Sequence, residues 1–146
     1  MDHKPPDDEQ LPHTYTLFTP GTATAPKVCR DFVRSALGAE GLGWLADTAA
    51  ICTSELVTNV HLHVGGEVHV RLAVEREQVR VAVYDGGGAP GRPVPRRAAV
   101  GDLGGRGLFL VTALADGCGV TAARPGTGVW FTLGRRGASH GGGGGG

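Results

Sequence analysis

The sequence has 146 residues, which is enough for one domain with its own hydrophobic core. Its 14 Lys and Arg balance 14 Asp and Glu, so no general positive field draws it to nucleic acid or to an anionic membrane. No apolar run approaches the roughly 20 residues of a membrane-spanning helix, and the start, MDHKPPDDEQLPH, has no hydrophobic signal segment. These features predict a cytoplasmic protein that contacts neither nucleic acid nor a membrane directly.

The cysteines and histidines do not indicate a metal site. Cys29, Cys52 and Cys118 show no C-x-x-C or zinc-ligand spacing. They are predicted to be reduced core residues, because a free thiol behaves as a small apolar side chain. His61 and His63 form an H-x-H pair, but on a helix they point about 160° apart and cannot share one metal ion.

The two ends of the chain differ in composition from the middle. Residues 1–13 are polar and contain proline, and residues 135–146 end in six consecutive glycines. Such segments bury too little apolar surface to fold, so both are predicted to be disordered. One domain is predicted between them, over residues 14–134.

The domain opens with a predicted short strand, Tyr15–Phe18, and a predicted helix, Pro26–Leu37. Pro26 suits a first helical turn, and Gly38 suits the position just past the end. Apolar residues recur at four-residue intervals within this segment, at Val28, Phe32 and Ala36. This spacing predicts a helix.

A second, longer helix is predicted from Leu42 or Trp44 to His63. Glu55, Asn59 and His63 follow one another at intervals of one turn, at the edge of a buried stripe. That stripe spans an arc of about 80° and contains Leu45, Ala49, Cys52, Leu56, Val60 and His63. The polar side chains are therefore expected to face the interior or a cleft.

The period then changes from helical to alternating. Apolar residues alternate with polar ones at Val68, Val70, Leu72 and Val74, and again, after a turn at Glu75–Gln78, at Val79, Val81 and Val83. This pattern predicts an antiparallel hairpin with one buried face.

A long segment without helix or strand pattern follows, at residues 86–104, with six glycines and three prolines among 19 residues. Loops of this length in compact domains are commonly functional, so we interpret it as a lid. A Gly-Arg-Gly run then opens a predicted helix, Leu108–Ala115, and two predicted strands close the chain, at 119–123 and 129–133. The order predicts a two-layer α/β sandwich, with helices on one face of a mixed, largely antiparallel sheet.

Four motifs occur in order along the chain: SELVTNVHLH, VYDGGGAP, GGRGLFLV and GTGVWFTL. Together they resemble the N box, the two glycine boxes and the terminal strand of the Bergerat-fold (GHKL) ATP-binding proteins. The chain looks most like the single-domain anti-sigma factor serine kinases of actinobacteria. The resemblance covers most of the predicted domain and implies ATP and Mg²⁺ as cofactors.

The resemblance assigns the metal and catalytic roles to the N box. Asn59 would hold Mg²⁺, and an amide oxygen suits this task because it coordinates the ion without repelling phosphates. Glu55 would lie beside the γ-phosphate and orient or deprotonate the attacking hydroxyl. The alternative for Glu55 is a solvated helix residue in an ion pair. His63 would lie near the nucleotide, or pack as an ordinary histidine at the core edge.

The first glycine box implies adenine recognition. Asp85 can accept a hydrogen bond from the adenine amino group, which guanine lacks at the equivalent position. Gly87 and Gly88 allow the backbone to approach the base. Thr127, just before the last predicted strand, would place a hydroxyl near the adenine. The alternative for Asp85 and Thr127 is that they are ordinary turn residues.

The second glycine box implies a phosphate site. Gly105, Arg106, Gly107 and Leu108 would present backbone N–H groups at a helix start, which is a natural anion site. Phosphates need no Walker lysine in such an arrangement, and the sequence contains no G-x-x-x-x-G-K-[ST] motif.

The implied function is an ATP-dependent serine/threonine kinase that phosphorylates an antagonist (anti-anti-sigma) protein. Such a protein would bind a sigma factor through another surface and form a homodimer. The alternative is a non-catalytic, nucleotide-dependent interaction module on the same fold. Two departures from the family pattern bear on this choice: Leu62 stands where related kinases commonly have Arg or Lys, and the first glycine box lacks the D-x-G-x-G form. The ATP domain of a histidine kinase is not expected, since 13 residues before the domain cannot supply a phosphoacceptor helix pair.

Overall fold

The computed structural model describes residues 11–63, 66–85, 105–122 and 127–135. The elements are, in chain order, β1 (His13–Pro20), α2 (Ala25–Ala39), the 3₁₀ turn η1 (Gly43–Leu45), α3 (Ala46–His63), β2 (Glu67–Val74), β3 (Gln78–Tyr84), α4 (Gly105–Leu114), β4 (Gly117–Ala122) and β5 (Thr127–Gly134). The predicted lid, and the predicted disordered segments up to residue 10 and from residue 136 onward, lie outside the described residues.

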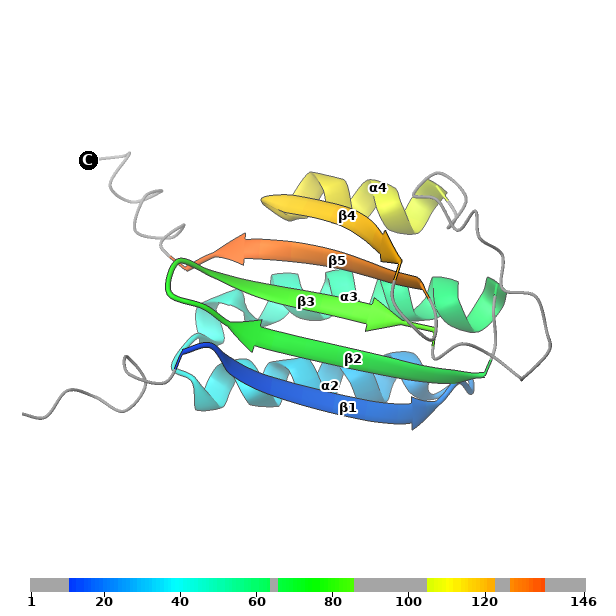
Figure 1. The fold of residues 1–146 in the computed structure, drawn as a ribbon. Helices are drawn as coiled ribbons and strands as arrows, with labels where there is room; N and C mark the ends of the chain where they lie inside the picture. The colour runs from blue at the N-terminus through cyan, green and yellow to red at the C-terminus, as the bar shows by residue number, and fades with distance from the viewer. Residues whose placement is uncertain (1–10, 64–65, 86–104, 123–126, 136–146) are drawn as a thin grey trace, which may run out of the picture.

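Five strands form one sheet in the order β1-β2-β3-β5-β4, and each neighbouring pair is antiparallel. The helices α2, α3 and α4 all lie on one side of this sheet (Figure 1). None of the described helices is long and apolar enough to cross a membrane. The predicted two-layer α/β sandwich with helices on one face is therefore confirmed.

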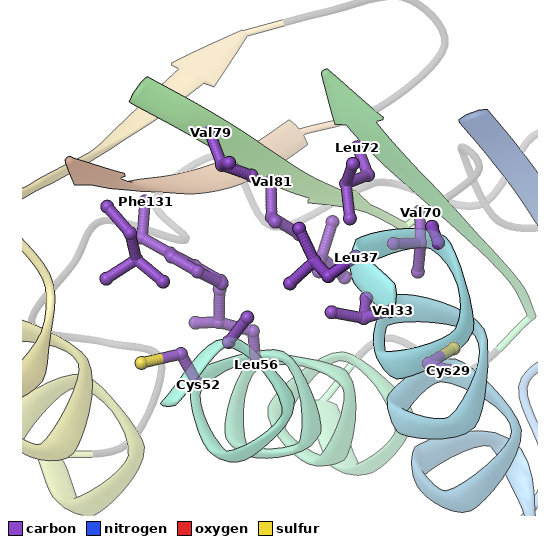
Figure 2. Packing of buried hydrophobic residues seen from close by; sticks show 14 of the residues in the cluster. Cys29, Val33, Leu37, Cys52, Leu56, Val70, Leu72, Val79, Val81 and Phe131 are labelled. Atoms are coloured by element: carbon purple, nitrogen blue, oxygen red, sulfur yellow. The ribbon is translucent and has the colours of Figure 1, made fainter. Parts of the chain in front are cut away.

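The hydrophobic core fills the space between the helices and the sheet. Figure 2 shows side chains from the strands pointing toward side chains from α2 and α3: Val70, Leu72, Val79, Val81 and Phe131 from the sheet, and Cys29, Val33, Leu37, Cys52 and Leu56 from the helices. All of these are at most 1% exposed. Burial of each large apolar side chain stabilises the fold by about 1.5–3 kcal/mol, so this layer is the main source of stability.

The predicted hairpin is confirmed as β2 and β3. Val74 pairs with Val79 at its tip, where the N–H of Glu75 donates to the carbonyl of Gln78 at 2.8 Å. The first strand is longer than predicted. It begins at His13 and runs for eight residues, because its whole length pairs with β2. The ordered chain therefore starts before Thr14.

The buried side of α2 differs from the four-residue repeat seen in the sequence. Cys29, Val33 and Leu37 are fully buried, whereas Val28 is 41% exposed and Phe32 is only partly buried. Both sets of residues have helical spacing, and only the contacts of α2 with α3 and the sheet decide between them.

The other two helices also differ from their predicted limits. The long helix is preceded by η1 as a separate 3₁₀ turn, and α3 itself begins at Ala46. The last helix begins at Gly105, three residues earlier than predicted. Val111 is fully buried on that helix, whereas Leu114 is 41% exposed.

Candidate functional site

Several elements begin or end together at one end of the molecule. There α3 and β3 end, and α4 and β5 begin, at the right-hand side of Figure 1. We call this the site end. The backbone therefore brings Asn59, His63, Asp85, Gly105 and Thr127 to the same end of the sandwich, although up to 68 residues separate them along the chain.

Asn59 is the one described residue of the site end with a buried polar atom that lacks a partner. The residue is 8% exposed, and its Nδ2 atom makes no hydrogen bond within the described residues. Leaving such a group unsatisfied costs about 1–3 kcal/mol, so it requires an explanation. A bound ligand or ion would provide one.

The Asn59 amide fits a Mg²⁺ site. A side-chain amide can rotate by half a turn and present its oxygen in place of its nitrogen. Within the described residues, no three His, Cys, Asp or Glu side chains gather into a metal-binding group. Mg²⁺ commonly takes most of its ligands from phosphate oxygens and water, so one protein oxygen is compatible with such a site.

Glu55 lies one turn before Asn59 on α3, about 40° around the helix axis. Its side chain is half-buried, and its carboxylate forms no ion pair with another described residue. The part of the chain that the structure describes thus offers no partner for the ion-pair alternative. A half-buried carboxylate beside the Asn59 amide can accept a proton from a hydroxyl placed between them.

Cys52 lies in the turn before Glu55 and stays a neutral thiol. Burial raises the pKa of Cys52 to about 11, and the nearby Cys118 and Glu55 raise it by smaller amounts. This thiol therefore adds no negative charge to the site at neutral pH.

Asp85 follows directly after β3 and is 2% exposed. The last residue of β3, Tyr84, pairs with Gly128 of β5, so Asp85 leaves the sheet between two interior strands. An aspartate in an ordinary surface turn is exposed to water. The burial of Asp85 therefore favours the interpretation as a binding residue.

The start of α4 lies at the site end, as Figure 1 shows. This ten-residue helix begins at Gly105 and includes Arg106, Gly107 and Leu108 in its first turn. A helix start carries about half a positive charge and N–H groups without internal partners. The side chains of Arg106 and Leu108 lie outside the described part of the structure.

Four other predicted site residues are described incompletely. Gly87 and Gly88 lie outside the described residues. His63 is the last residue of α3 and Thr127 is the first residue of β5, but nothing is described of their side chains. Their roles stay predictions.

The structure also contains a hollow that the sequence did not reveal. It has a volume of about 360 Å³ and lies at the end of the molecule opposite the site end, lined by Trp44, Leu45, Thr48, Leu114, Asp116, Leu133 and Gly134. Its lining comes from two parts of the chain that are far apart in sequence: η1 and the start of α3, and the segment from the end of α4 to the end of β5. Trp44, which is 46% exposed, identifies the hollow in the structure. A single tryptophan in a sequence does not predict a hollow.

Comparisons with known proteins agree with this architecture. Among solved structures, the chain is similar to the RsbU and RsbW domains of Rv1364c from Mycobacterium tuberculosis, with a TM-score of 0.60 and 19% identity. The alignment covers 83% of this chain and 31% of that one, so this chain spans less than a third of that protein's length. At this identity the likeness shows the fold alone. A search of curated proteins finds no match. Residues 19–133 match the family described as the histidine kinase-like ATPase domain, and the chain therefore belongs to that family.

Proposed function

We propose that this protein is an ATP- and Mg²⁺-dependent serine/threonine kinase of the anti-sigma factor type, with its nucleotide at the site end. Membership of the histidine kinase-like ATPase family supports ATP binding. The observation that carries the proposal is the buried Asn59 amide without a partner, one turn after Glu55 and at the same end as the buried Asp85.

In this proposal Asp85 selects adenine. Its carboxylate accepts a hydrogen bond from the amino group of adenine, and the carbonyl that guanine carries there would face it unfavourably. Calorimetry with ATP, ADP and GTP, with and without Mg²⁺, tests the assignment. The wild type should prefer ATP over GTP by at least about tenfold, and Asp85→Asn should lose that preference.

Asp47→Asn is the matched control for this experiment, because it removes the same charge from a side chain that is 87% exposed in the first turn of α3. That variant should bind ATP like the wild type. Equal and weak binding of all three nucleotides by the wild type would contradict the nucleotide site itself.

Asn59 holds Mg²⁺ through its side-chain oxygen in this proposal. The bound ion supplies charge neutralisation at the phosphates. The backbone N–H groups at the start of α4 hold phosphate oxygens, which explains how the site works without a Walker lysine. Asn59→Ala should therefore reduce the dependence of ATP affinity on Mg²⁺.

Glu55 takes the proton of the acceptor hydroxyl. The serine oxygen forms a bond to the γ-phosphorus, the bond between that phosphorus and the β–γ bridging oxygen breaks, and ADP leaves. Glu55→Gln should lose phosphoryl transfer from radiolabelled ATP by about a hundredfold or more while ATP still binds. Glu67→Gln removes an exposed carboxylate from β2 and should leave transfer unchanged.

A non-catalytic interaction module on the same fold is the second candidate. Leu62 favours it, because a leucine before His63 supplies no cation for a phosphate. The measurements on Glu55 separate the two candidates. A module binds ATP but shows no turnover in the wild type, so Glu55→Gln has nothing to remove.

The proposed partners are a sigma factor and a serine-bearing antagonist protein, which places the protein in the cytoplasm. The resemblance of the four sequence motifs to the anti-sigma factor serine kinases supports this partner class. A homodimer is proposed as well. Light scattering on the purified protein, alone and with a candidate sigma factor, measures both assemblies. A monomer under all conditions, with no complex, would contradict them.

A further inference from the structure

The sheet face opposite the helices carries large side chains that the core does not use. Arg71 of β2, Arg80 of β3 and Trp130 of β5 all lie on this face, because the residues on either side of each are buried in the core. No described helix covers this face, which is turned toward the viewer in Figure 1.

Trp130 and Arg80 form a stacked pair on this face. The guanidinium carbon of Arg80 lies 4.5 Å from the centroid of the Trp130 ring. The indole also lies over the backbone of Gly119 on β4, where an added Cβ would come within 2.8 Å of it. Ala82, which pairs with Trp130 in the sheet, is only 5% exposed. The residues beside the Trp130 ring on β3 and β4 are thus small and do not project above it.

The charges on this face are not neutralised within the described structure. Arg71 is exposed, and neither Arg71 nor Arg80 forms an ion pair with a described acid. Glu67, the acid on the same strand, pairs instead with His69 at 3.0 Å. The centre of the face therefore presents two guanidinium groups beside an indole, which is the composition typical of interface hot spots.

We propose that this open face docks an acidic surface of a partner protein, with Trp130 as the apolar contact and Arg71 and Arg80 binding carboxylates. A second copy of this chain fits less well, because a twofold axis would place the arginines of the two copies opposite one another. Nucleic acid fits less well too, because the chain has a net charge of zero and supplies no general attraction to phosphates. This proposal is independent of ATP binding, since the face lies on the side of the sheet away from α3 and α4.

The test uses Trp130 as its own reporter. The chain has two tryptophans, and Trp44→Phe leaves Trp130 as the sole indole. Two synthetic amphipathic peptides serve as probes. One has a polar face made only of glutamate, and the other has lysine at each of those positions. The glutamate peptide should shift the Trp130 emission and bind at least about tenfold more tightly than the lysine peptide, with an affinity that falls as salt is added.

Two double variants in this background locate the binding. The double variant Arg71→Gln with Arg80→Gln should bind the glutamate peptide about tenfold or more weakly than the Trp44→Phe protein does. Lys27→Gln with Arg34→Gln removes the same charge from exposed positions on α2 and should change binding less than about twofold. Circular dichroism confirms that each variant is folded.

Three results would overturn the proposal. The first is equal binding of the two peptides, or equal losses in the two double variants. The second is tighter binding of an oligothymidylate than of the glutamate peptide, which would indicate a nucleic-acid surface. The third is a dimer that dissociates in the Arg71 and Arg80 variant, which would indicate that a second copy covers this face.

Discussion

The two ends of the sandwich treat their buried polar groups in opposite ways. Opposite the site end, the Glu40 carboxylate, whose side chain is 8% exposed, accepts a hydrogen bond from the hydroxyl of Tyr15 and lies 2.9 Å from Nδ1 of His13. At the site end, the buried Asn59 leaves its Nδ2 without a partner in the described residues. The Glu40 carboxylate is thus satisfied internally, whereas the Asn59 amide retains binding capacity.

The same contrast extends to the backbone near the first end. The Asp116 carboxylate accepts the N–H of Gly134 at 2.6 Å, and Arg135 donates to the carbonyl of Glu75 at 2.9 Å. Most buried polar groups in proteins are paired, and within the described residues the Asn59 Nδ2 and the Thr53 Oγ1 are the buried side-chain atoms without a partner. The comparison suggests that stability and ligand binding are separable here, and substitutions at the two ends can test this.

The largest expected effect is on stability, at the end opposite the site. Glu40→Ala removes a charged acceptor and leaves the Tyr15 hydroxyl and the His13 ring without it, so the free energy of unfolding should fall by about 3 kcal/mol. Urea denaturation measures this loss, and calorimetry of the folded variant should give wild-type ATP affinity. A matching loss of ATP affinity would show that the two ends are coupled.

The next effect concerns the buried thiols, one of which, Cys29, lies in the half of α2 nearer the site end. Burial raises the pKa of Cys29 and of Cys52 to about 11, from 9.0 for a free thiol. Below pH 9 the folded protein should therefore contain about a hundredfold less thiolate at these positions than the unfolded chain, and iodoacetamide should label them correspondingly slowly. The partly buried Cys118 should react first.

The same thiols make stability depend on alkaline pH. The unfolded thiols ionise near pH 9 and the folded ones near pH 11, so the unfolded state loses protons first as the pH rises. Their contribution to the free energy of unfolding is therefore complete below about pH 9 and is lost as the pH rises toward 11. Urea denaturation at pH 8 and at pH 10.5, on the wild type and on Cys29→Ala with Cys52→Ala, measures it. Identical pH slopes in the two proteins would refute this origin.

Smaller effects on stability are expected at two glycines, Gly119 and Gly38. At Gly119 an added methyl would meet the Trp130 ring at 2.8 Å, so Gly119→Ala should destabilise the protein by about 1–3 kcal/mol. Gly38 lies in the last turns of α2 with open space around it, and Gly38→Ala should stabilise it by about 0.5–1 kcal/mol. Thermal denaturation distinguishes the two signs, and a stable Gly119→Ala protein would mean that the indole can move aside.

The smallest change in stability is expected at the site end itself. Asn59→Ala removes a buried amide whose nitrogen has no partner, and alanine favours the helix, so the free energy of unfolding should change by less than about 1 kcal/mol. Phosphoryl transfer should nevertheless be lost. A large destabilisation would show that Asn59 is a structural residue and would remove the contrast between the two ends.

The layered fold could be predicted because its signals are local. The alternation through Val68–Val74 and Val79–Val83 requires a half-buried hairpin, and the structure confirms it. The buried side of α2 could not be predicted, because Val28 and Cys29 both begin helically spaced apolar sets. Only the approach of α3, a long-range contact, selects the set that contains Cys29.

The residue types of the candidate site could be predicted from the sequence more fully than their positions in space. The spacing of Glu55 and Asn59 on one helix follows from its pitch, and the structure shows Asn59 buried and Glu55 half-buried on that helix. The sequence does not reveal that β5 separates β3 from β4, which brings Asp85 out between interior strands. The roles of Gly87, Gly88 and the proposed lid stay predictions, because they lie outside the described residues.

The strand order also has a consequence for synthesis on the ribosome. β5 is the last strand to emerge, yet it occupies an interior position beside β3. Until residues 127–134 have been translated, the growing polypeptide exposes a valine-rich strand edge that cannot find its native neighbour. The nascent chain is therefore exposed to aggregation at this edge between the synthesis of β3 and that of β5.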